Sequence, residues 1–400
     1  MSNQPAILLA APHRLLFLVG SANLGLTATW WLIQLTSLHF GGPRLPQGDL
    51  PAALLHGPMM LYLVFPPFML GFLLTVFPRW MGQSDLGPRQ FGPVAMLQAA
   101  GALAAHAGLW SGTDPLLLAG FGIVAAGWAL AITALGRVAA IHRRSGKPAN
   151  WHAVSALVAL FCGLIGLITS IWSLSASNSV LWALGNQIGL SGFLLPLFLT
   201  VAHRMVPFFA GSVVQDYVRW RPDWLLAALW VLLGARLAGA WFEQSIAAVL
   251  ADCGLFILTA AMAWKWWPRS AAPGLLKALI WGFAWAPVGF GLSALAAAGF
   301  ELGRAPLHAL TIGFAGSLLI AMVTRVTQGH SGQQLAMTGA AWLAFGAIQL
   351  ASLLRIGAAL QLENGAALVG AALVLAFGLL PWLLRNALTY VRKRSDGRPG

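Results

Sequence analysis

Long apolar segments recur along this chain of 400 residues and are separated by short polar breaks. A helix rises about 1.5 Å per residue, so segments of this length can cross the hydrocarbon core of a bilayer. Only 8% of the residues are charged, whereas soluble domains carry about 25%. The sequence therefore predicts an all-α integral membrane protein, a polytopic bundle of about twelve helices forming a single domain over residues 1–400. The predicted spans lie near 14–36, 54–78, 93–110, 115–138, 152–174, 180–203, 224–242, 245–265, 275–299, 306–326, 336–356 and 365–388.

The positive charges collect on one side of these predicted spans. The formal net charge is +13, and 19 of the 23 lysines and arginines lie on the side of the first residue if the spans alternate in direction. The positive-inside rule places that side, with both ends of the chain, in the cytoplasm. The charge thus reflects topology and gives no reason to expect nucleic acid as a partner; the expected partner is the lipid bilayer.

The two cysteines exclude several kinds of cofactor site. Cys162 and Cys253 both lie in apolar segments, far apart in the sequence, and the chain has no CxxCH motif. Covalent haem attachment, iron–sulfur clusters and cysteine-based zinc sites are therefore not expected.

Histidines at membrane depth are the main candidates for chemistry, because an imidazole there is costly unless it has a partner. His56 begins the second span, His308 begins the tenth and His203 ends the sixth. Neutral imidazole binds haem iron and copper. His56 and His308 are expected at the same outer depth, where two helices could hold a haem between them. His330 lies 22 residues after His308, or roughly 33 Å along a helix, so these two cannot share a metal.

The remaining histidines and the methionines after His56 have simpler interpretations. Met59 and Met60 follow His56 on the same helical face, where thioethers could bind Cu(I) or haem iron, although methionine commonly just fills gaps in apolar packing. Four histidines near loops are expected to be solvated, namely His13, His39, His142 and His152. A fifth, His106, lies within the third span and could hydrogen-bond a neighbour.

A second group of candidates lies at the inner ends of the spans. Arg79, Arg204 and Arg325 end spans two, six and ten. The guanidinium fork suits carboxylates such as haem propionates, but the positive-inside rule alone predicts arginine there. Within the membrane, Arg236 and Asp252 are expected to pair.

Three blocks of the sequence together resemble the NnrS family of bacterial membrane proteins. They are LHGPMMLYLVFPPFMLGFLLTVFPRWMG, VAHRMVPFF and HALTIGFAGSLLIAMVTRVTQGHSG. The resemblance implies a multi-pass protein of the bacterial cytoplasmic membrane with haem b and copper, which acts in nitric oxide metabolism, denitrification or protection from nitrosative stress. The functional positions that it implies are His56, His203, Arg204, His308, Arg325 and His330.

The second span departs from the family pattern. Members usually show His-x-His-Glu-Met there, whereas this chain has His56-Gly57-Pro58-Met59-Met60. One possible metal ligand and one carboxylate are missing, which weakens the expectation of copper.

Three functions remain open on the sequence. The first is a haem protein that binds or detoxifies nitric oxide. The second is a redox enzyme laid out like the haem–copper oxidases and nitric oxide reductases, although the seventh span has no His-His pair. The third is a secondary transporter, although matched halves are not evident. The electron donor of any redox reaction is not indicated.

Overall fold

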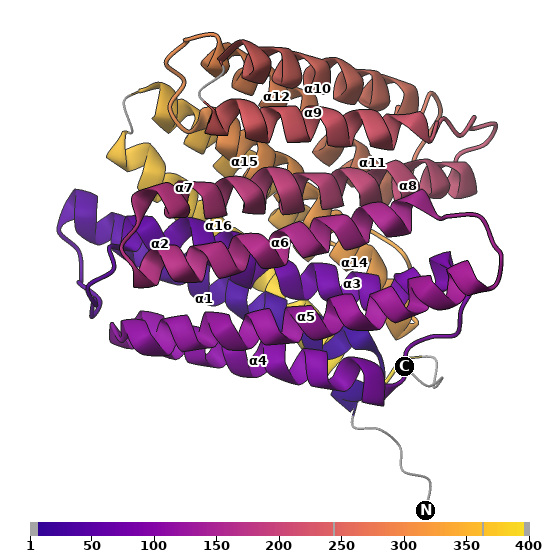
Figure 1. Cartoon of the computed structure of the whole chain (residues 1–400), viewed down its shortest axis with the longest axis horizontal. Coiled ribbons are helices and arrows are strands. Elements are labelled where there is room, and N and C mark those ends of the chain that lie inside the picture. The colour runs from indigo at the N-terminus through magenta and orange to yellow at the C-terminus, as the bar shows by residue number, and fades with distance from the viewer. Residues whose placement is uncertain (1–6, 243–244, 362–363, 396–400) are drawn as a thin grey trace, which may run out of the picture. The chain divides into compact units, whose positions relative to one another are not determined.

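The computed structural model describes residues 7–242, 245–361 and 364–395, and these ranges contain helices and no strand (Figure 1). The prediction of an all-α polytopic membrane protein is confirmed. The elements are η1 (Ile7–Leu9), α1 (Pro12–Phe40), α2 (Ala52–Met59), η2 (Met60–Val64), α3 (Phe65–Trp80), α4 (Pro88–Ser111), α5 (Asp114–Arg144), α6 (Trp151–Ser175), α7 (Ser179–Gln187), η3 (Ile188–Leu194), α8 (Leu195–Val213), α9 (Trp224–Trp241), α10 (Ser245–Trp266), α11 (Gly274–Phe283), α12 (Trp285–Ala297), α13 (Ala305–His308), η4 (Ala309–Gly316), α14 (Ser317–Ser331), α15 (Gly339–Leu360) and α16 (Gly365–Tyr390).

Ten helical segments of the described chain are long and apolar enough to cross a membrane. Helix α4 and the shorter apolar helix α9 occupy the other two predicted positions. The predicted break between the seventh and eighth spans, at Glu243 and Gln244, lies outside the described residues.

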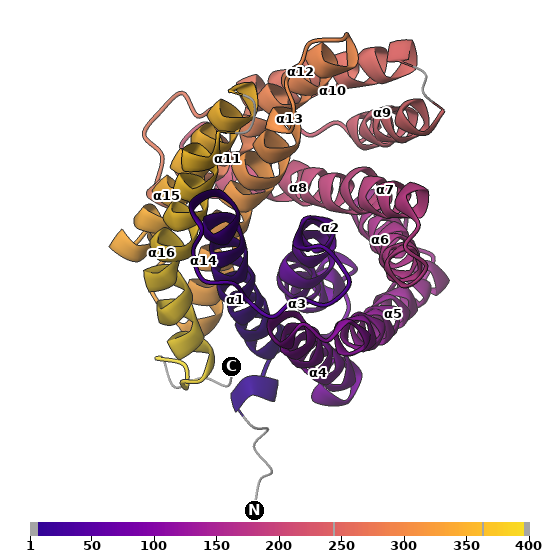
Figure 2. The same cartoon turned by 90° about the vertical axis from the view of Figure 1, so that its left-hand side faces the viewer.

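The chain divides into two compact units. Unit 1 comprises Met1–Leu190, Val326–Gln334 and Leu383–Gly400. Within it, α4 packs on α5, α5 on α6 and α6 on α7, while α1 packs on α3 and α4. Figure 2 shows α1, α4, α5, α6 and α7 arranged around the segment formed by α2 and α3.

Unit 2 comprises Ser191–Arg325 and Leu335–Trp382. Its helices α9, α10 and α12 form a packed series, and α12 also contacts η4. The opposite side of η4 is covered by α15, and α8 packs on α9 and α11.

Three spans are interrupted by π-helical turns, which are η2, η3 and η4. The sequence explains the first interruption. Pro67 has no N–H and cannot donate to the carbonyl of Leu63, its acceptor in a regular helix. The Asn23 side chain of α1 donates to that carbonyl instead, with Nδ2 at 2.7 Å from the oxygen. Asn23 is 1% exposed. The carbonyl that the proline leaves without its donor is therefore hydrogen-bonded by a buried amide of another helix.

Candidate functional site

The three spans that carry the family-like sequence blocks are the most buried helices of the chain. In the most apolar stretch of each span, the buried share is 89% for Ala52–Trp80, 78% for Ser179–Val213 and 83% for Ala305–Ser331. In every other candidate span of the described residues it is at most 50%. They are also the three spans that contain the π-helical turns. Such turns frequently occur at functional sites, because they redirect side chains and free backbone groups.

The same three spans share a spacing that the sequence analysis missed. A phenylalanine stands eleven residues before the arginine at the span end in each case, in the pairs Phe68 and Arg79, Phe193 and Arg204, and Phe314 and Arg325. All three phenylalanines are at most 2% exposed. Spans two, six and ten therefore follow one plan, in which a broken segment precedes a regular helix that carries the arginine three turns after the phenylalanine.

His56 lies in α2, four residues before η2, and is half-buried. Its ring stacks on Trp31 of α1, with ring centroids 4.1 Å apart and an interplanar angle of 17°. Met59 is fully buried and Met60 half-buried at the start of η2. The stacking fixes the plane of the imidazole, which a ligand histidine requires.

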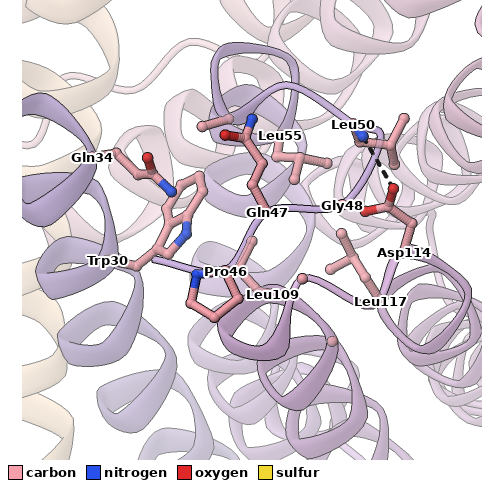
Figure 3. A pocket seen from close by; sticks show the side chains of 13 residues that line it. Trp30, Gln34, Pro46, Gln47, Gly48, Leu50, Leu55, Leu109, Asp114 and Leu117 are labelled. Atoms are coloured by element: carbon pink, nitrogen blue, oxygen red, sulfur yellow. Dashed lines mark hydrogen bonds between the residues drawn. The ribbon is translucent and has the colours of Figure 1, made fainter. Parts of the chain in front are cut away.

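A pocket lies near this end of unit 1, and Figure 3 shows its lining. Trp30 and Gln34 of α1 contribute to it, as do the loop before α2 and the start of α5. The Asp114 carboxylate accepts a hydrogen bond from the backbone N–H of Leu50 at 3.0 Å, and Gly48 packs directly against it. The carboxylate thus anchors the loop before α2, and we assign the pocket no ligand.

His308 is the last residue of α13, directly before η4, and is 8% exposed. Its Nδ1–H donates to the carbonyl oxygen of Arg304 at 2.9 Å. A ring that donates from Nδ1 in its neutral form carries its lone pair on Nε2, which is the usual arrangement of a metal-ligating histidine.

His203, Arg204 and Arg325 all belong to unit 2. His203 is fully buried in α8, and its ring lies 6.3 Å from that of Trp266. The Arg325 guanidinium lies over the ring of Phe209, also in α8, at 3.7 Å from the centroid. The structure thus brings the arginine of span ten against the helix of span six, as a cation–π contact.

His330 lies against another histidine. It lies in unit 1, where its ring is 4.6 Å from that of His13. The expectation that His13 is solvated is wrong, because the residue is 2% exposed. It is likewise wrong for His142 and His152, which are 8% and 4% exposed; His142 lies between the carbonyl oxygens of Met81 and Pro148.

The other polar expectations are resolved as follows. His39 is exposed as predicted, and His106 is buried in α4. The predicted pair of Arg236 and Asp252 is confirmed, with Nε at 2.7 Å from Oδ1. A second Arg236 nitrogen donates to Ser191 in η3 at 2.7 Å.

Two predicted arrangements are not established. His56 lies in unit 1 and His308 in unit 2, and their joint site stays a prediction. Among the described residues, no three histidine, cysteine, aspartate or glutamate side chains gather to hold a metal ion.

At the end of span two, Arg79 donates from Nε and Nη2 to the carboxylate of Asp85, which lies in the loop after the span, at 2.9 and 2.8 Å. This hydrogen bonding lowers the pKa of the Asp85 carboxyl. The pair is more than half exposed, so solvent screens most of its energy.

Comparison with known proteins completes the description. No curated protein matches the chain. The model of the NnrS protein family matches residues 7–394, nearly the whole length. The chain therefore belongs to the NnrS family.

Proposed function

We propose that this protein binds haem b and acts in nitric oxide metabolism or in protection from nitrosative stress. Membership of the NnrS family supports the link to nitric oxide. Nitric oxide is small and apolar, so it can reach a buried iron through lipid without a polar channel. When bound, haem would supply an iron centre that takes nitric oxide as a ligand.

The observation that carries the proposal is the setting of His308. The hydrogen bond from Nδ1 to Arg304 selects the tautomer with its lone pair on Nε2. The ring lies beside η4, in one of the three most buried spans. Burial and a fixed tautomer are what an axial haem ligand needs.

His56 is the second proposed ligand, oriented by its stacking on Trp31. Copper is the second proposed cofactor. Its support is narrower, because it rests on His56 with the thioethers of Met59 and Met60, a donor set that suits Cu(I). At the other end of the spans, His203 and the half-buried Arg204 and Arg325 are proposed as a separate group that binds carboxylates, because 17 residues or about 25 Å of helix separate Arg325 from His308 and keep it from a haem held there.

The decisive experiment is purification in detergent after haem-sufficient expression, followed by oxidised and reduced absorption spectra and iron and copper analysis. We expect a Soret band that is lost or shifted in His308→Ala and His56→Ala. His39→Ala, a change at an exposed histidine in the last turn of α1, is the matched control and should leave the spectrum unchanged. Absence of a Soret band in the unsubstituted protein, or unchanged haem in both ligand variants, would refute the proposal.

Consumption of nitric oxide by the reduced protein in vesicles then separates an enzyme from a binding protein. Turnover beyond one nitric oxide per haem indicates catalysis. Stoichiometric uptake with a spectral change indicates binding alone.

A further inference from the structure

Five basic side chains gather at one end of unit 1, where α1 begins and α3, α14 and α16 end. We name them the basic cluster; its members are His13, Arg14, Arg79, His330 and Arg394. The two imidazoles are in ring contact, and the three arginines act electrostatically on both. The carboxylate of Asp85 pairs with Arg79 and acts electrostatically on His330.

The back of the basic cluster is buried. His13 and Arg14 are 2% and 3% exposed. Arg14 uses Nη1 to donate to the carbonyl oxygens of Tyr390 and Arg392, at 3.2 and 2.7 Å, and so caps the end of α16. Its Nε has no acceptor among the described residues. The positive-inside rule predicts arginines at this depth, but it does not require that one be buried without a counter-ion.

The front of the basic cluster is open. His330 and Arg394 are half-exposed, and Arg79 is exposed. The uncapped first turn of α1 lies at the same place, and a helix N-terminus favours negative charge. The cluster therefore combines a buried guanidinium and imidazole at its back with solvent-accessible basic side chains at its front.

From this arrangement we infer that the basic cluster binds a phosphate-type oxyanion, supplied either by the headgroup of an anionic phospholipid or by free phosphate. Arginine and imidazole N–H groups recognise phosphate oxygens, and basic pockets between the cytoplasmic ends of membrane helices bind anionic headgroups. A metal cation is disfavoured at the two imidazoles because three arginines repel it. The inference does not depend on haem.

The site is tested with the full chain in neutral detergent, using thermal unfolding as the readout. A ligand that binds only the folded state raises the unfolding temperature in proportion to its occupancy. The probes are phosphatidylglycerol in mixed micelles, phosphatidylcholine at the same concentration, and inorganic phosphate in chloride-matched buffer. Stabilisation by phosphatidylglycerol alone identifies a lipid headgroup, and stabilisation by inorganic phosphate identifies a free oxyanion.

Variants locate the binding. His330→Gln and Arg14→Gln should weaken the affinity about tenfold, the loss of one hydrogen bond to a charged group. Arg14→Gln also removes the cap of α16, so Asp85→Asn provides an independent test. It removes the negative charge that competes with a bound anion and frees the Arg79 guanidinium, and it should strengthen binding severalfold. Arg89→Gln, at an exposed arginine beyond the cluster, should change nothing.

The inference is overturned if neither probe stabilises the protein more than phosphatidylcholine. It is equally overturned if His330→Gln and Asp85→Asn bind as the unsubstituted chain does.

Discussion

Replacing Tyr62 by phenylalanine tests whether the broken segments of spans two and six support each other. Tyr62 belongs to η2 and is fully buried. Its hydroxyl donates to the carbonyl of Gly185 in the last turn of α7, three residues before η3, at 2.6 Å. Loss of the bond costs about 0.5–1.5 kcal/mol, and the Gly185 carbonyl keeps the backbone N–H of Ile188 as a donor, so we expect Tyr62→Phe to destabilise the fold by about 1 kcal/mol.

Equilibrium unfolding in mixed detergent micelles measures this loss. Tyr217→Phe is the matched control, because the Tyr217 hydroxyl bonds to Trp266 at 3.3 Å from a half-buried position. Water can replace that bond, so the control should lose less than about 0.5 kcal/mol.

A glycine near the hydroxyl allows a sharper test. A methyl group added at Gly166 would overlap the Tyr62 hydroxyl. Gly166→Ala should therefore be strongly destabilising alone and less so in the Tyr62→Phe background, with a coupling of at least about 0.5 kcal/mol. Additive effects, or equal losses for Tyr62→Phe and Tyr217→Phe, would refute the reasoning.

Three further predictions concern other contacts. With the proposed haem bound, Trp31→Ala should broaden or shift its spectrum and change its reduction potential by releasing the ring of His56, while Trp31→Phe largely restores both; spectroelectrochemistry checks this, and identical potentials in all three proteins would contradict it. Asp252→Asn should destabilise the fold by about 3 kcal/mol because Arg236 stays buried without its counter-ion, whereas the double change Arg236→Met with Asp252→Leu should remain within about 1 kcal/mol of the unsubstituted protein in unfolding assays. The pKa of Asp85 is lowered in the folded state, so its ion pair stabilises the fold fully above the pKa of the unfolded chain, about 4. This stabilisation is lost as the pH falls through the lower pKa of the folded state. Unfolding temperatures of the unsubstituted protein and Asp85→Asn should thus converge as the pH falls toward 3, by a small amount since the pair is exposed; a gap that widens on acidification would contradict this.

The sequence predicts the helical membrane architecture because hydropathy acts locally, residue by residue along each span. It also predicts the pair of Arg236 and Asp252, since two opposite charges in apolar helices have few alternatives. It does not predict that His13 is buried. A histidine beside the first span and a basic residue looks solvated, whereas in the fold Thr75 of α3 and His330 of α14 pack against its ring.

The π-helical turns were likewise not foreseen. Pro66, Pro67 and Pro196 indicate distortion, but whether a proline produces a kink or a wider turn depends on which neighbouring group donates a hydrogen bond to the carbonyl that the proline leaves without a partner. For the carbonyl of Leu63, the donor is the side chain of Asn23. The candidate ligands His56 and His308 can be predicted from residue type and expected depth in the membrane, because both follow from the sequence. The tautomer of His308 and the stacking of His56 cannot, because they depend on contacts that only the folded structure shows.

The hydrogen bond from Tyr62 to Gly185 also has a consequence for biosynthesis. Its two partners are 123 residues apart, so at the usual 5–20 residues per second the hydroxyl waits on the order of ten seconds for its acceptor to be made. During that interval span two must rest in the translocon or bilayer with a polar group exposed to apolar surroundings. Maturation of this protein is therefore expected to be most vulnerable between the insertion of spans two and six.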